Sequence, residues 1–190
     1  EVYPLLRERE AVEHPEAHAL VERAHYQPFL SARILAANLH FLLRSPWRYL
    51  TTITAALMRT LPSPNFFAGA LVFLPKSVLF AREMRDSGVE HLHAHFANHP
   101  ALAAAVVHRL TGIPFSFTAH GSDLHVDQTA LGWKLAQAEF AVTVSAYNRE
   151  FVRRRVGALA DKLRVIHCGV DPRLYVRAGE IPSATFEILC

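Results

Sequence analysis

Cysteine is scarce in this 190-residue chain, since Cys168 and Cys190 are the only two. Two thiols cannot build a disulfide framework, so we expect a reducing compartment, such as the cytoplasm. Glycine is also sparse, and no G-x-G-x-x-G run of the dinucleotide-binding type occurs among the eight glycines. Long apolar runs are lacking as well: the longest strongly apolar stretch, residues 66–75, is too short to span a bilayer.

A large excess of charge is absent too. The formal net charge is +3, so the pI near 9.1 does not by itself indicate a nucleic-acid partner. The basic run 153–155 spreads over more than half of a helix circumference, which is typical of a solvated helix end, and we expect no nucleic acid. With 51% hydrophobic residues, the chain has the size and composition of a globular domain with a real core. Its first ten residues are charged and unlike a signal peptide.

Residues 29–59 show a helical spacing of apolar residues, divided at Ser45 and Pro46, an N-cap followed by a first-turn proline. A third helix, broken or kinked at Pro75, is expected to reach about residue 86. Wide apolar faces lie beside narrow polar stripes that contain Arg33, Arg44, Arg48 and Arg59. Such helices either cover a sheet or lie on an anionic membrane, and both interpretations stay open here.

From residue 89 the pattern changes to short strands that alternate with helices. The predicted strands are 89–96, 114–119, 140–144 and 163–167, and the predicted helices are 100–111, 129–138 and 146–156. Alternation of this kind implies right-handed crossovers and a parallel sheet. The sequence therefore predicts an α/β fold, Rossmann-like, with helices on both faces of the sheet.

The turn after the second predicted strand carries His120, Gly121, Ser122 and Asp123. Ligands of open α/β sheets bind beyond the carboxyl ends of the strands, so this turn is a candidate site. Histidine titrates near neutral pH, aspartate can orient it or bind a sugar hydroxyl, and glycine lets a ligand approach the backbone.

Several histidines, His91, His93, His95 and His99, also invite a metal interpretation. No cysteine and no H-E-x-x-H helix accompanies them, so we expect no metal. We expect His95 to end a strand at the ligand edge, and His91 and His93 to form local contacts.

Read together, the segments 93–97 (HAHFA), 112–123 (GIPFSFTAHGSD), 144–148 (VSAYN) and 165–171 (VIHCGVD) resemble the amino-terminal half of retaining glycosyltransferases of family 4. Members that resemble this chain in the segment 93–96 (HAHF) often act in bacterial exopolysaccharide or lipopolysaccharide assembly. The resemblance covers 88–175 by motif and 25–88 by helix pattern. It implies the N-terminal half of a GT-B fold, in which two Rossmann-like domains face a cleft.

The resemblance also implies roles for particular residues. His120 and Asp123 would be catalytic, with His120 against the transferred sugar. The residues expected to bind substrate are His95, Gly121, Ser122, Ser145 and Asn148. The partners would be a nucleotide-sugar donor and a glycan or lipid-linked acceptor, with no metal and no cofactor apart from the donor.

For domain organisation, we expect residues 1–175 to form the acceptor-side domain with a truncated start. Residues 176–190 would hold the linker and the first strand of a donor domain, and 186–190 has a strand pattern that begins where the sequence stops. We therefore expect a fragment that does not turn over alone. Two other functions remain open: an NAD-dependent oxidoreductase, which would need a glycine-rich loop, and a non-catalytic carbohydrate-binding or membrane-associated module.

Overall fold

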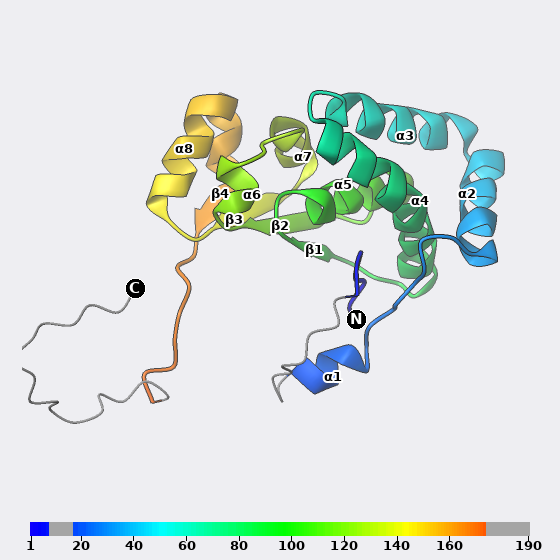
Figure 1. Ribbon diagram of the computed structural model, residues 1–190, viewed down its shortest axis with the longest axis horizontal. Helices are drawn as coiled ribbons and strands as arrows, with labels where there is room; N and C mark the ends of the chain where they lie inside the picture. The colour runs from blue at the N-terminus through cyan, green and yellow to red at the C-terminus, as the bar shows by residue number, and fades with distance from the viewer. Residues whose placement is uncertain (8–16, 174–190) are drawn as a thin grey trace, which may run out of the picture.

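The computed structural model describes residues 1–7 and 17–173, and a four-stranded parallel sheet lies at its centre (Figure 1). The strands pair in chain order, with Ala94 opposite Phe117 and Phe117 opposite Ala141. Their bounds are β1 Leu92–His95, β2 Phe115–Ala119, β3 Phe140–Thr143 and β4 Leu163–Val165. Each lies within a predicted strand, so the predicted parallel α/β, Rossmann-like sheet is confirmed.

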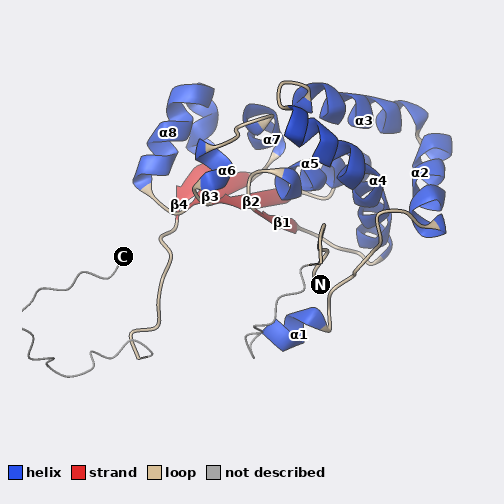
Figure 2. Ribbon diagram, viewed as in Figure 1, coloured by secondary structure: helices blue, strands red, loops and turns tan. Residues whose placement is uncertain are grey.

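The crossover helices gather on one side of this sheet (Figure 2). Because each crossover steps to the next strand in the same direction, right-handed connections place their helices on the same face. Helical cover in the described part of the chain is therefore concentrated on one face, and only the short α1, His18–Val21, is drawn below the sheet. The crossover helices are α5 His99–Thr111, α6 Ser122–His125, α7 Leu131–Gln137 and α8 Ala146–Val156.

A second layer of helices packs outside α5. It consists of α2 Ala32–Arg44, α3 Pro46–Thr60 and α4 Pro64–Asp86, which confirms the predicted helices and the division at Ser45. Ser45 occupies the N-cap of α3, but its side chain makes no capping hydrogen bond. Its backbone N–H instead closes α2 by donating to the carbonyl of Phe41 at 2.9 Å.

Helix α4 runs through Pro75 as one element. A proline removes the hydrogen bond to the carbonyl four residues earlier, here Leu71, whose side chain is exposed on the solvent side of the helix. By length and composition α4 could cross a membrane, but half of its most apolar window is buried inside the fold. The core helix of a soluble domain has the same properties, and α4 packs here between α5, α2 and α3.

Two core clusters hold these layers together. Beneath the crossover helices, Phe115 and Phe117 of β2 pack against the small side chains Ala101, Ala104 and Ala105 of α5, which let the helix lie close to the sheet. A second cluster joins α3, α4 and α5 through Ala56, Phe66, Val78, Phe80, Val106 and Leu110.

The two ends of the described chain contribute little to these layers. The expected linker and donor-domain strand, 176–190, fall outside the described residues. The first 28 residues, which have little sequence pattern, contribute α1 and an isolated bridge between Val2 and Ala24.

Candidate active site at the carboxyl edge of the sheet

Two histidine rings meet where β1 and β2 end. His95 is the last residue of β1, and His120 follows the last residue of β2, so parallel pairing brings them to the same edge. Their Nε2 atoms lie 3.0 Å apart and their ring centroids 4.6 Å apart. A neutral imidazole has one N–H and one lone pair, so one ring donates this hydrogen bond and the other accepts it. The two predicted residues, 25 positions apart in the chain, therefore form one pair.

Phe96 closes this pair on one side. Its ring centroid lies 4.7 Å from that of His95 and 5.0 Å from that of His120. Its φ of 82° is in the left-handed region, which a bulky residue other than glycine rarely adopts. Backbone strain of this kind costs about 1–3 kcal/mol and is concentrated at functional sites. Phe96 could not be predicted as a site residue from the sequence, because phenylalanine does not favour a positive φ.

Asp123 joins the loops that follow the two strands. One carboxylate oxygen accepts a hydrogen bond from the backbone N–H of Ala97 at 2.7 Å, and the other accepts from that of His120 at 2.9 Å. The residue is only 5% exposed. Both of its oxygens are thus engaged inside the protein, where they fix the backbone that carries the histidine pair.

Ser145 and Asn148 support the same loop from α8. The Ser145 hydroxyl caps this helix by accepting from the Asn148 N–H at 3.1 Å. The buried amide of Asn148 donates to the His120 carbonyl, and its oxygen contacts Nε2 of His125 at 3.0 Å. Like Asp123, these two residues have their polar groups turned toward the protein, under the His120 loop.

Gly121 and Ser122 lie on the open side of the loop. Ser122 is exposed, and beyond Gly121 and its two chain neighbours no atom of the described residues lies within 4 Å of the position where a side chain on Gly121 would begin. A ligand can therefore approach the backbone here, next to the His95–His120 pair. Of the seven predicted site residues, these four are the ones that face outward, whereas Asp123, Ser145 and Asn148 form their support.

His91, just before β1, and His93, within it, form the local contacts that the sequence predicts. His91 and His93 both contact the Ser116 hydroxyl at 2.8 Å, and His93 also contacts that of Thr118 at 2.8 Å. Within residues 1–7 and 17–173, no group of three or more His, Cys, Asp or Glu side chains is arranged to hold a metal ion.

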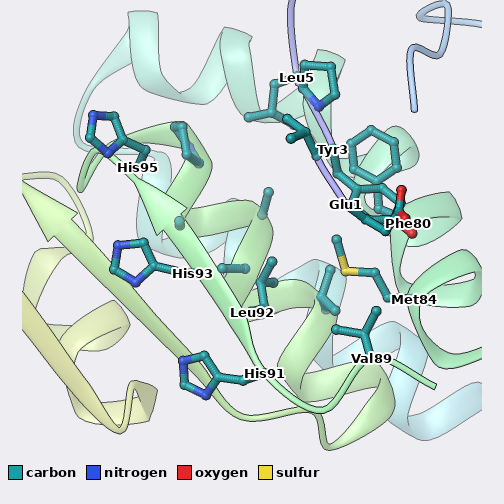
Figure 3. Close-up of a pocket in the computed structure, with 17 residues that line it drawn as sticks. Glu1, Tyr3, Leu5, Phe80, Met84, Val89, His91, Leu92, His93 and His95 are labelled. Carbon is teal, nitrogen blue, oxygen red and sulfur yellow. The ribbon is translucent and has the colours of Figure 1, made fainter. Parts of the chain in front are cut away.

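Beside β1, the edge strand of the sheet in the described part of the chain, lies a cavity of about 620 Å³ (Figure 3). Tyr3 and Leu5 border it from the N-terminal segment, and Phe80 and Met84 border it from α4. Figure 3 shows the β1 histidines pointing away from these side chains. Its lining is mainly apolar, and its polar members are Glu1, Tyr3, His91, His93 and His95. Because His95 belongs to the histidine pair, the cavity adjoins the histidine edge, where polar groups suited to a sugar lie together, and this edge is the better candidate site.

Two ionisable groups near the edge have a lowered pKa. Burial, followed by the nearby His120, lowers the pKa of His95, which favours a neutral ring in the pair. Burial lowers the pKa of Lys134 on α7 to about 7, opposed by the carboxylates of Asp127 and Asp123. Its Nζ donates to the Thr129 carbonyl at 2.8 Å and lies 4.8 Å from the centroid of the Phe66 ring. The burial of Lys134 could not be predicted from the sequence, since a single lysine in an amphipathic helix is normally solvated.

The geometry therefore defines a polar edge on a Rossmann-like domain, with an imidazole pair at its centre. The sequence profile of Glycosyltransferase Family 4 matches residues 44–174, well over half of the chain. The chain belongs to this family. The match includes α3 and α4 as well as the whole sheet, so it extends beyond the motif-bearing segments. Neither the curated proteins nor the solved structures gave a match to this chain.

Proposed function

We propose that this domain is the acceptor-side half of a retaining glycosyltransferase. It would transfer a hexose from a nucleotide-sugar donor to a glycan or a lipid-linked acceptor, in the synthesis of a bacterial exopolysaccharide or lipopolysaccharide. We place it in the cytoplasm, at the inner face of the cell membrane. Family membership supports the general activity. The finer statements rest on the arrangement at the sheet edge and on the motifs that surround it.

The observation that carries the proposal is the His95–His120 pair beside the open backbone at Gly121. Imidazole N–H and N groups are suitable hydrogen-bond partners for sugar hydroxyls, and the missing side chain lets the sugar ring come close. The pair lies at the carboxyl end of the strands, which is where open α/β sheets bind their ligands.

In this proposal His120 binds the transferred sugar. Glycosyl transfer passes through an oxocarbenium-like transition state, in which positive charge develops on the sugar ring. A neutral imidazole of His120, held next to the ring, would stabilise this charge. Asp123 and Asn148 hold the His120 backbone, and His95 holds its ring, so little reorganisation is needed during the reaction. The donor diphosphate would bind to a second, donor-binding domain, without a metal or another cofactor.

The test is transfer by the full-length protein from a panel of nucleotide-sugar donors, with the anomeric configuration of the product determined by NMR. We expect retention of configuration. His120→Ala should lower kcat by about 100-fold, because a contact that tightens in the transition state is lost.

His91→Ala is the matched control, since His91 contacts Ser116 before the start of β1 and away from the histidine pair. It should keep the wild-type kcat. An inverted product would contradict the retaining mechanism, and an unchanged kcat in His120→Ala would contradict the assignment of this residue. Glycan binding without any transfer would favour the non-catalytic module, and reduction of a nicotinamide cofactor would favour the oxidoreductase.

A further inference from the structure

Helix α2 presents a stripe of leucines to solvent. Ile34, Ala37 and Phe41 face the core, so the opposite side of the helix is the outer one. Four leucines with the spacing i, i+4, i+7, i+8 lie on that outer side: Leu35, Leu39, Leu42 and Leu43. Leu43 is 71% exposed. An amphipathic helix normally turns such a stripe inward, so this helix has two apolar faces, and only one of them is covered.

Helix α3 repeats this arrangement. Thr52, Ala56 and Thr60 are buried, while Trp47, Leu50, Met58 and Leu61 are exposed. Trp47 is 79% exposed. The side chains between them on the outer face are the threonines Thr51 and Thr54, so this face bears no charge. Scattered exposed apolar residues are ordinary, but exposed apolar faces on two successive helices mark an interaction surface.

The charged residues of the segment that contains α2 and α3 have one sign. No Asp or Glu occurs from residue 23 to residue 82, and the Lys and Arg residues of this stretch are Arg23, Arg33, Arg44, Arg48, Arg59, Lys76 and Arg82. On α3, Arg48 and Arg59 form a stripe about 100° around the helix from Trp47 and Met58. These two arginines therefore flank the apolar face and leave it uncharged.

The four arginines of the sequence-based expectation are not equivalent. Arg33 contacts Glu83 of α4 at 2.8 Å, so its charge is already compensated. Arg44, Arg48 and Arg59 are exposed, and none forms an ion pair with a carboxylate in the described part of the chain. The available charge thus consists of these three residues.

We propose that the outer faces of α2 and α3 bind an anionic lipid bilayer. The leucines, Trp47 and Met58 would enter the boundary between headgroups and acyl chains, and Arg44, Arg48 and Arg59 would contact lipid phosphates. The one-sided charge favours a bilayer over a second copy of this chain, because two such faces would repel each other. The inference deepens the proposed function, on which it rests for a lipid-linked acceptor nearby, but vesicle binding does not depend on sugar transfer.

The experiment is co-sedimentation with vesicles of phosphatidylcholine alone, and of phosphatidylcholine and phosphatidylglycerol in equal amounts. The wild-type chain should bind the anionic vesicles and bind the zwitterionic ones weakly. Each basic residue near an anionic surface strengthens binding roughly fivefold, so replacing Arg44, Arg48 and Arg59 together by Gln should weaken it about 100-fold. The matched control replaces Arg149, Arg155 and Arg164 by Gln, which removes the same amount of charge. These arginines belong to the region of α8 and β4, which lies far from α2 in Figure 1. The control variant should bind like the wild type.

The apolar contribution has its own readout. Trp133→Phe leaves Trp47 as the only tryptophan, and its fluorescence should shift to the blue when anionic vesicles are added. Leu43→Gln with Trp47→Gln should reduce binding while the circular dichroism and Tm stay near wild type, since both side chains are exposed. Equal binding by the two arginine variants, or no binding by the wild type, would overturn the proposal. A third result would also overturn it: a wild-type chain that does not bind vesicles but forms a dimer in light scattering, with the dimer lost in the Leu43→Gln, Trp47→Gln variant.

Discussion

Asp123→Asn tests how the edge of the sheet is held. The carboxylate accepts from the N–H groups of Ala97 and His120, at 2.7 and 2.9 Å, inside the protein. A hydrogen bond to a charged acceptor contributes about 1.5–3 kcal/mol. Asparagine keeps one acceptor oxygen but turns an NH₂ group toward the other N–H, so the expected loss is about 2–4 kcal/mol. Asp123→Ala leaves both donors unpaired and should lose about 3–6 kcal/mol.

The assay is urea unfolding followed by tryptophan fluorescence, supported by the Tm, which should fall by roughly 5–10 °C in Asp123→Asn. Asp161→Asn is the matched control, because this exposed carboxylate pairs with Arg153 at 2.7 Å and such pairs contribute less than about 1 kcal/mol. A free energy of unfolding within about 0.5 kcal/mol of wild type for Asp123→Asn would refute the reasoning. Asp123 would then be free for direct contact with substrate.

Two further predictions concern stability. Burial gives Lys134 a pKa of about 7 in the folded chain, against 10.5 for an ordinary lysine. Between these values the unfolded chain binds more protons than the folded chain. The free energy of unfolding should therefore rise between pH 7 and about 10, by at most about 1.4 kcal/mol per pH unit. Lys134→Met should abolish this rise in urea unfolding at several pH values; an unchanged slope would mean that the amine is solvated. A side chain on Gly69 would begin 2.3 Å from the His99 ring, whereas at Gly132 the nearest atom is 3.6 Å away. Gly69→Ala should therefore destabilise the chain by about 1–3 kcal/mol and Gly132→Ala stabilise it by about 0.5–1 kcal/mol in the same assay, and an opposite order would contradict the packing.

The sequence was sufficient to predict the strands, most helices and the edge at which the site lies. Strand ends such as His95, and helix stops such as Gly112, whose φ is 86°, depend on local chemistry that one sequence displays. The pairing of His95 with His120 could not be derived from spacing, because it depends on the register of β1 against β2. Whether a polar side chain points into the protein or toward a ligand could not be predicted from the sequence either. Asp123 and Asn148 are equally suited to a ligand and to backbone support, and only the fold decides between the two.

The exposed faces of α2 and α3 show a related limit. Their apolar periodicity is visible in the sequence, but it does not tell which of two apolar faces meets the core. The structure resolves this at Ile34, which is buried, and at Leu43, which is exposed. The same residues that predict a helix therefore predict its orientation only when one face is polar.

The measurement that tests the central claim most directly is a crystal structure of the full-length protein with a nucleotide-sugar donor. The account predicts that the His120 imidazole lies about 2.6–3.2 Å from a hydroxyl of the transferred sugar, with the ring held by His95 and the sugar above Gly121. A sugar bound in the apolar cavity beside β1, or one without contact to His120, would contradict it.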